Sequence, residues 1–328
     1  MLKYVIKRIL LMLLTLFIIL SMCYILIKLL PLPPVRGTAE TQQLVEAQRQ
    51  AKGYYDPLIK QFFNFWKRVL TKFDWGAGEN LYPTQSVIHI IGQKLPATIV
   101  INLFAMLFSV PIGLLLGIFA AVKKNKWQDH FISVAVMLCI SVPSFVFAFL
   151  LQYVFCYKLG WFPILMERLE ITATTTTGEI FAQLFRPSMV RSLIPAIFAL
   201  SIGTIAGLTR YTRAELSEVL TGDYMLLART KGLTRRQATV RHALRNAMVP
   251  IFPMILGEFV GILSGSLVLE NIFTIPGIGN LYVNAIRALD YNFFMADSAF
   301  YTAIGLAAGI VVDLSYGFID PRIRMGAK

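Results

Sequence analysis

Charged residues are scarce in this chain, at 15% of its 328 positions, whereas apolar residues make up 56%. Soluble domains carry about 25% charged residues, so this composition excludes an ordinary soluble enzyme or binding module. Several apolar runs reach the roughly 20 residues that a helix needs to cross a bilayer. The sequence therefore predicts an all-α integral membrane protein.

Residues that perform enzyme chemistry are also few. No Gly-Lys dipeptide occurs, so the chain has no P-loop with which to bind ATP. The three histidines show no metal-ligand spacing, and the three cysteines lie in apolar runs, which favours a packing role over a redox one. These residues are His89, His130, His242, Cys23, Cys139 and Cys156. We expect no catalytic residue, no metal and no cofactor in this chain.

The formal charge of +13 would suggest a nucleic-acid partner if the protein were soluble. In a membrane protein, however, the placement of Lys and Arg matters more, because basic loops favour the cytoplasmic side. Basic residues are more than twice as dense in one alternating set of loops as in the other. The denser set comprises residues 1–8, 123–130, 210–247 and 320–328, and the sparser set comprises 31–96, 158–192 and 271–297. We therefore expect a lipid bilayer as partner, no nucleic acid, and both termini in the cytoplasm.

Six transmembrane helices are predicted, near residues 9–30, 97–122, 131–157, 193–209, 248–269 and 298–319. The first follows Lys3, Lys7 and Arg8 as a signal-peptide core would. It is about 22 residues long and lacks a cleavage site, which indicates a retained span. An even number of spans agrees with two cytoplasmic termini.

Proline and glycine interrupt several of these spans. The breakers are Pro111 with Gly113 and Gly117, Pro143, and Pro250 with Pro253. Because proline removes a backbone donor, these positions are either kinks in a packed bundle or parts of a mobile gate. Gly257, Gly261 and Gly265 are spaced at four, which lets another helix approach, from this subunit or from a second one.

The segment 31–96 is long enough to hold structure of its own. Residues 38–51 are typical of a polar helix. Residues 57–73 mix apolar and basic side chains as an amphipathic helix does, and this helix either lies at the membrane surface or packs as a small cap over the spans. The polar stretch 172–178 is most simply a surface turn.

The loop at 210–247 contains three pieces with local start and stop signals. Residues 210–220 continue the helix of the fourth span, and Gly222 ends that helix. Asp223 is a suitable N-cap for a second, short helix at 223–231, and Gly232 suits its C-terminal end. Thr234 and Gln237 have the spacing of a capping box that begins a third helix leading into the fifth span.

The short helix at 223–231 is unusual because it is apolar within a cytoplasmic loop. It carries Tyr224, Met225, Leu226 and Leu227 in succession, with Arg229 and Lys231 nearby. A helix this short is marginal alone in water, so something must hold it. Packing within the chain, lipid headgroups and a groove on a partner protein are three alternatives that these residues leave open.

The sequence between residues 223 and 250 resembles the coupling loop of ABC-importer permeases. It reads DYMLLARTKGL and, after a short gap, RHALRNAMVP. Ala228 and Gly232 fall on the second alanine and the glycine of that superfamily's EAAxxxG pattern. Leu226 replaces the glutamate and Leu227 the first alanine, as in the DY…ARxKG form of the oligopeptide, dipeptide and nickel branch. The chain thus resembles that branch, and in it the first of two oligopeptide-type permease subunits.

The resemblance extends over almost the whole chain. Its further segments are KRILL at 7–11, KLPAT at 94–98, PSF at 143–145, LGWFP at 159–163, LENIFTIPGIGNL at 269–281, the pair Asp290 and Tyr291, and VDLSYGFIDPRIR at 312–324. PLPP at 31–34 departs from the family's PGDP-like turn. We divide the chain into a first span at 1–30, an extracytoplasmic segment at 31–96 and a five-helix permease core at 97–328.

The resemblance implies a subunit in the bacterial cell membrane that pairs with a second permease. Two ATPase subunits, which bind ATP and Mg²⁺, would lie beneath the pair, and an extracellular binding protein would deliver cargo. The residues implied to couple to the ATPase are Asp223, Tyr224, Met225, Leu226, Leu227, Ala228, Arg229, Lys231 and Gly232. Peptides are the expected cargo, with dipeptides or nickel chelates as alternatives. A secondary transporter is a rival class, but it would have more spans and internal repeats.

Three acidic residues in or beside the spans are candidates for substrate or partner contacts. Buried charge is costly in a membrane, so Glu258 and Asp313 either line the translocation path and meet a peptide, or form structural contacts between helices. Glu270, at the outer end of the fifth span, is expected to be a cap or a contact for the binding protein.

Overall fold

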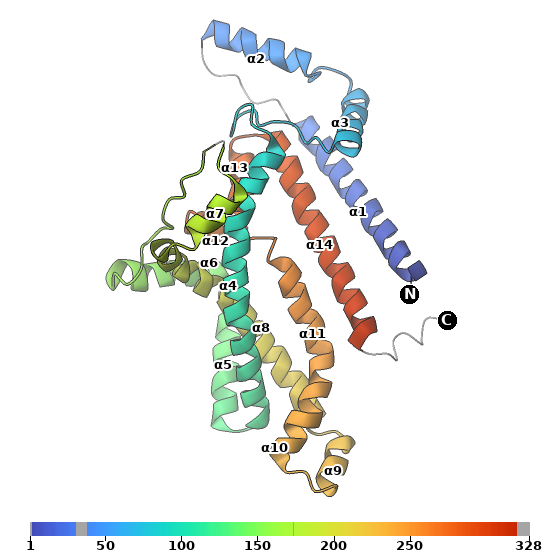
Figure 1. Cartoon of the computed structure of the whole chain (residues 1–328), viewed down its shortest axis with the longest axis vertical. Coiled ribbons are helices and arrows are strands. Elements are labelled where there is room, and N and C mark those ends of the chain that lie inside the picture. The colour runs from blue at the N-terminus through green and yellow to red at the C-terminus, as the bar shows by residue number, and fades with distance from the viewer. Residues whose placement is uncertain (1, 31–37, 173, 320–328) are drawn as a thin grey trace. The chain divides into compact units, whose positions relative to one another are not determined.

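The computed structural model describes residues 2–30, 38–172 and 174–319, and the regular secondary structure of this part of the chain is helical, with two isolated β-bridges, Ala77–Ser86 and Gly78–Pro83, in a loop (Figure 1). The prediction of an all-α protein is confirmed. The helices are α1 (Leu2–Leu29), α2 (Ala39–Ala51), α3 (Leu58–Lys72), α4 (Val87–Val122), α5 (Trp127–Ser141), α6 (Ser144–Leu151), α7 (Thr177–Leu184), α8 (Pro187–Val219), α9 (Asp223–Thr230), α10 (Arg235–Ala238), α11 (Leu244–Gly261), α12 (Leu267–Ile272), α13 (Ile278–Arg287) and α14 (Tyr291–Ile319). Two π-helical segments, Gln152–Lys158 and Thr239–Ala243, extend α6 and join α10 to α11. The PLPP segment at 31–34, which departs from the family's usual turn, lies outside the described residues. The end of the 312–324 segment lies outside them as well.

Five helices in the described part are long and apolar enough to cross a membrane: Val5–Leu29, Val87–Val122, Pro187–Val219, Arg235–Gly261 and Tyr291–Ser315. The sixth is a bent pair, Trp127–Ser141 with Ser144–Lys158, whose two parts meet at 99°. The third span was predicted near 131–157 with an interruption at Pro143, and the break between α5 and α6 lies at that proline. Val142 is extended because the residue before a proline avoids the helical region, and Pro143 is then the N-cap of α6.

The fifth span is shorter than the sequence predicted. It was expected to run to residue 269, but α11 ends at Gly261. Gly265 then takes a φ of +61°, a conformation that suits glycine, and the chain turns into the separate helix α12. Glu270 therefore belongs to α12 and not to a membrane span. The stretch 172–178 is also more than a turn, because Thr176 forms a capping box with Glu179 at the start of α7.

The chain divides into two compact units, and the first comprises Met1–Ile6, Gln93–Asn280 and Ile304–Lys328. Its helices α4 and α8 approach closely at two glycines. A Cβ on Gly113 would lie 2.8 Å from Leu208 Cβ, and one on Gly117 would lie 2.8 Å from the Thr209 carbonyl oxygen. An ion pair then joins α5 to α8, since Arg213 donates to both carboxylate oxygens of Asp129, with 2.8 Å from Nη2 to Oδ2. These contacts hold α8 firmly against its neighbours.

The second unit comprises Lys7–Gly92 and Leu281–Ala303. Here α3 packs an aromatic face onto α1: the ring centroids of Phe17 and Trp66 are 4.6 Å apart, as are those of Tyr24 and Phe65. This face fits the alternative of a cap packed on a span. The opposite face of α3 leaves Ile59, Phe63 and Leu70 exposed, as a surface helix would. The helix α3 therefore combines a face that packs on a span with an exposed apolar face suited to the membrane surface.

Candidate coupling loop and translocation cavity

The short loop helix is present as α9, an eight-residue helix between two glycines. Gly222, with φ −70° and ψ 151°, is its N-cap. The prediction that Asp223 is the N-cap of this helix is wrong, because Asp223 occupies the first helical position. At that position its negative charge still favours the helix N-terminus through the helix dipole.

The C-terminal signals of α9 are confirmed. Gly232 takes a φ of +87°, in the left-handed region that favours glycine. Its amide donates to the Arg229 carbonyl over 3.0 Å, and the Leu233 amide donates to the Ala228 carbonyl over 3.3 Å. The capping box of the next helix is also formed, since Thr234 and Gln237 each accept a hydrogen bond from the other's backbone amide. The loop thus has a defined shape.

The two faces of α9 have different surroundings. Met225 and Ala228 are 5% and 7% exposed and pack in a cluster with Leu216 of α8 and Ile251 of α11. Leu226 and Leu227, in contrast, are 65% and 56% exposed. Packing within the chain, one of the three alternatives, therefore explains one face of the helix. The other face remains available to a membrane or a partner.

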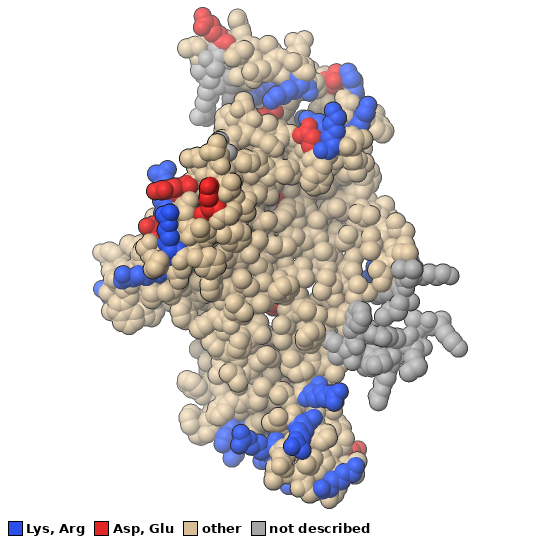
Figure 2. Space-filling view, viewed as in Figure 1, with Lys and Arg blue, Asp and Glu red and all other residues tan. Residues whose placement is uncertain are grey.

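The loop segments that hold this exposed apolar face also carry exposed basic side chains. They are Arg229, Lys231, Arg235, Arg236, Arg241 and Arg245, all exposed. Figure 2 shows blue side chains gathered at the bottom of the view, where α9 and α10 lie in Figure 1, with little red among them. An apolar patch within a positive rim suits a partner surface with an apolar groove and acidic edges, because opposite charges steer such an encounter.

A cavity of about 480 Å³ lies among α4, α8 and α11 of the first unit. Its lining is a mixture of small, apolar and polar residues: Asn102, Ala105, Met106, Ser109, Leu200, Thr204, Met254, Gly257, Glu258, Gly261 and Ile262. The Glu258 carboxylate accepts a side-chain hydrogen bond from the Thr204 hydroxyl. Of the two acidic path candidates, the structure places Glu258 on the cavity wall.

Asp313 does not belong to the residues that line this cavity. It lies half-buried on α14, one position after Val312, whose Cγ2 would lie 3.5 Å from a Cβ on Gly257. At the other cavity glycine, Gly261, an added Cβ would meet no described atom within 4 Å. The small residues of α11 therefore open the cavity wall as well as permitting close helix packing.

The polar residues of the cavity other than Glu258 were missed at the level of sequence. The Asn102 side chain donates to the carbonyls of Thr98 and Ile262, each over 3.0 Å, and so ties α4 to the end of α11. Ser109 and Thr204 are likewise single polar residues inside apolar runs. No spacing rule distinguishes such residues from ordinary packing residues, so only the assembled helices reveal that they share a wall.

Glu270 lies in the interior of the first unit, with 2% exposure. Its carboxylate accepts hydrogen bonds from the Thr98 hydroxyl and from the Asn280 amide, each 2.9 Å long. Burial raises the pKa of this carboxyl to about 7, although these hydrogen bonds oppose the shift. Because Asn280 is in the first turn of α13, Glu270 caps that helix from outside. The expected contact with a binding protein is not supported, since the carboxylate does not reach the surface.

These features define a multi-pass membrane protein. It has a polar cavity between its spans, and its loop helix α9 exposes one apolar face. The described residues contain no group of His, Cys, Asp and Glu that could hold a metal ion. Comparison with known families then gives the assignment. Residues 113–325 match the family described as binding-protein-dependent transport system inner membrane component, and residues 1–102 match its N-terminal family. The chain belongs to this family and is a permease subunit of an ABC importer.

Known relatives match over nearly the full length of both chains. The dipeptide transport system permease protein DppB of Bacillus subtilis is 34% identical over 99% of this chain and 99% of its own. The oligopeptide transport system permease protein OppB of Haemophilus influenzae is 32% identical over 99% of this chain and 100% of its own. The glutathione transport system permease protein GsiC of Escherichia coli K12 is 32% identical over 99% of both. The resemblance read from the motifs is therefore confirmed.

Proposed function

We propose that this chain forms half of the translocation pathway of an ATP-driven peptide importer. Its partners are a second permease of the same family, two ATPase subunits and an extracellular binding protein that delivers the peptide. ATP and Mg²⁺ bind to the ATPase chains, and this chain binds no cofactor. The names of the relatives, which transport dipeptides, oligopeptides and glutathione, support peptides as cargo.

The observation that carries this proposal is the division of α9 into two faces. Met225 and Ala228 anchor the helix to its own chain, while Leu226 and Leu227 face outward within a basic rim. Such a helix fits the groove of a partner as an amphipathic helix does. The density of basic residues in these loops favours a cytoplasmic position for α9 and both termini, on the side where the ATPases would bind.

The helices on either side of α9 connect it to the cavity. Thr204 and the last residue of α8, Val219, are separated by 15 positions, or about 22 Å of helix. On the far side of the loop, the continuous span Arg235–Gly261 carries Met254 and Glu258 to the same cavity. Closure of the ATPases would displace α9, and the two helices, α8 and the span Arg235–Gly261, would transmit the displacement to the cavity walls. The transporter would then alternate between inward- and outward-facing states.

The cavity has the chemistry of a path for peptides. Asn102, Ser109 and Thr204 offer hydrogen bonds to a peptide backbone, and Glu258 offers a counter-charge for an amino group. A path must bind cargo weakly, which suits one carboxylate among neutral polar groups. We expect Glu258→Gln to change uptake of peptides while leaving assembly with the ATPases intact; unchanged uptake across a peptide panel would remove Glu258 from the path.

The decisive experiment measures ATP-driven peptide uptake by the complete transporter in proteoliposomes. Leu226→Asp with Leu227→Asp should abolish uptake and reduce binding of the ATPases, because it places charge in an apolar contact. Thr221→Asp, an exposed position in the turn before α9, is the matched control and should leave uptake near normal. Normal uptake by the double variant would show that α9 does not couple the two subunits.

A further inference from the structure

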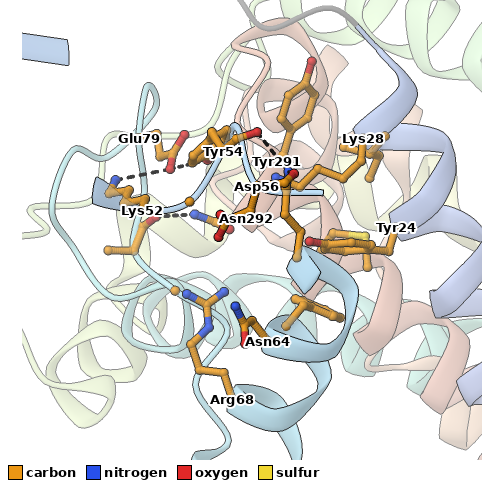
Figure 3. A pocket seen from close by; sticks show the side chains of 17 residues that line it. Tyr24, Lys28, Lys52, Tyr54, Asp56, Asn64, Arg68, Glu79, Tyr291 and Asn292 are labelled. Atoms are coloured by element: carbon orange, nitrogen blue, oxygen red, sulfur yellow. Dashed lines mark hydrogen bonds and ion pairs between the residues drawn. The ribbon is translucent and has the colours of Figure 1, made fainter. Parts of the chain in front are cut away.

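A second cavity, of about 260 Å³, lies in the unit formed by Lys7–Gly92 and Leu281–Ala303. Its walls come from the end of α1, the turn between α2 and α3, α3 itself, the loop after α3 and the start of α14. Figure 3 shows Lys28 and Arg68 reaching it from α1 and α3, with Tyr24, Tyr54 and Asn64 around them. Its lining is thus rich in charged and aromatic side chains.

The wall after α3 is fixed by the start of α14. The buried Asp290 carboxylate accepts hydrogen bonds from three successive backbone amides, those of Glu79, Asn80 and Leu81, at 2.8, 2.9 and 3.1 Å. The Asn292 side chain donates to the Ala77 carbonyl over 2.9 Å. A cavity whose wall is held by buried charge-assisted hydrogen bonds is a preformed one.

The two acidic groups of the cavity are occupied by neighbouring donors. Glu79 Oε1 accepts from the Tyr54 hydroxyl over 2.5 Å and from the Lys52 ammonium over 3.2 Å. Burial raises the pKa of Tyr54, and the nearby Glu79 raises it further, so this hydroxyl stays a donor. Asp56 pairs with Lys60 over 3.0 Å. Glu79 also attracts the Lys28 ammonium through space and offsets part of its charge, but the ion pairs of the two carboxylates within the described residues are with Lys52 and Lys60.

Lys28 and Arg68 leave positive charge in the cavity. The contacts of the Lys28 ammonium within the described residues are two tyrosine rings, with centroids 4.2 Å away for Tyr54 and 5.7 Å away for Tyr24. Arg68 meets Asp74 through Nε at a distance of 3.9 Å, which leaves its terminal nitrogens for another acceptor. A guanidinium and an ammonium on facing walls suit a phosphate, which accepts from both.

The cavity lies beside the end of a membrane span. Lys28 is in the last turn of α1, whose span ends at Leu29. Lysines at such positions extend to the headgroup layer, and tyrosines concentrate there. The adjoining apolar surfaces, Leu26 of α1 and Phe63 of α3, are 62% and 67% exposed, as expected beside lipid chains.

We propose that this cavity binds the phosphate of a phospholipid headgroup through Lys28 and Arg68. Its volume is below the roughly 300–1,000 Å³ of pockets that enclose larger ligands, which suits a headgroup rather than a peptide. The acyl chains would lie along the exposed apolar faces of α1 and α3. The bound lipid would fix α3 to α1 at the membrane surface.

Native mass spectrometry of the full chain in detergent, titrated with phosphatidylglycerol, tests this proposal. Lys28→Gln and Arg68→Gln should each weaken lipid retention about fivefold, the effect of one basic residue at a membrane surface. Lys67→Gln removes the same charge from the neighbouring position on α3, outside the cavity, and should change retention less than twofold. Lys28→Arg should retain the lipid.

Three outcomes would overturn the proposal. The first is equal loss of lipid in Lys67→Gln and Arg68→Gln, which would indicate general surface charge. The second is full retention in Arg68→Gln, whose exposed position keeps the fold intact if Lys28→Gln is unstable. The third is equal displacement of the lipid by inorganic phosphate or glycerol 3-phosphate, which would identify a soluble phosphate as the ligand.

Discussion

The hydroxyl of Thr98 donates a 2.9 Å hydrogen bond to the carboxylate of Glu270, across 172 positions of the sequence. The same hydroxyl oxygen accepts from the Ile278 amide over 2.9 Å. Thr98 ends the KLPAT segment and Glu270 lies in the LENIF segment, so two separate family motifs meet at one buried point. Their shared task is to hold the start of α13 against α4.

This arrangement predicts that stability falls as pH rises through the weakly acidic range. The folded pKa of Glu270 is about 7 and the ordinary value is 4.5, so the folded state holds the proton more tightly than the unfolded state. The contribution is complete below about pH 4.5 and is lost as pH rises to about 7. The shift corresponds to about 3 kcal/mol. Thermal unfolding in detergent between pH 4.5 and 8 measures it.

Glu270→Gln provides the control for that prediction. A glutamine resembles the protonated acid in shape but does not titrate, so the variant should lose the slope between pH 4.5 and 7. A slope that persists unchanged in Glu270→Gln would assign the pH dependence to other groups.

The ion pair between α5 and α8 predicts a strong coupling energy. Asp129→Asn should destabilise the chain by about 3 kcal/mol, the lower end of the range for a broken buried pair, because the Arg213 side chain is 32% exposed. The double variant Asp129→Leu with Arg213→Met should recover much of this loss, since it leaves no unpaired charge. A double-mutant cycle on the free energy of unfolding measures the coupling, and additive losses would contradict it.

The close approach of α4 and α8 predicts opposite effects of one substitution at two glycines. Gly117→Ala should cost about 1–3 kcal/mol, because its Cβ would press against the backbone of Thr209. Gly207→Ala should instead stabilise by about 0.5–1 kcal/mol, since nothing lies within 4 Å of the added Cβ and alanine favours helix. Unfolding midpoints of the two variants decide the question, and equal shifts would refute the packing argument.

The end of α9 predicts a loss of coupling on substitution of Gly232. A valine there must adopt a positive φ, at a cost of about 1–2 kcal/mol, or displace the helix that carries Leu226. Gly232→Val should therefore reduce ATP-driven uptake while the chain remains inserted in the membrane. Gly178→Val, at a position with ordinary φ and open space, should transport normally. Equal transport by both variants would count against the role of the α9 terminus.

Local signals predicted the loop well because each depends on neighbouring residues. The capping box at Thr234 and the positive φ of Gly232 follow from spacing alone. The sequence also predicted an interruption of the third span at Pro143. It did not predict the angle of 99° between the two parts, because the size of a bend at proline depends on tertiary packing.

The acidic residues show what sequence could not supply. Asp129 and Glu270 each find their partner on a distant helix, and nothing in the local pattern indicates that partner. Glu270 was expected near the surface because α11 was expected to continue to it. Instead α11 ends before the turn at Gly265, and the Glu270 side chain lies in the interior.

The division of α9 has a consequence for how this helix changes over evolution. A substitution at Met225 is constrained by the volume left by Leu216 and Ile251, so compensation for it arises within the same gene. A substitution at Leu226 meets no such constraint within this chain, and under the proposed contact with an ATPase its compensation would arise in another gene. Two adjacent residues of one short helix should therefore covary with different proteins.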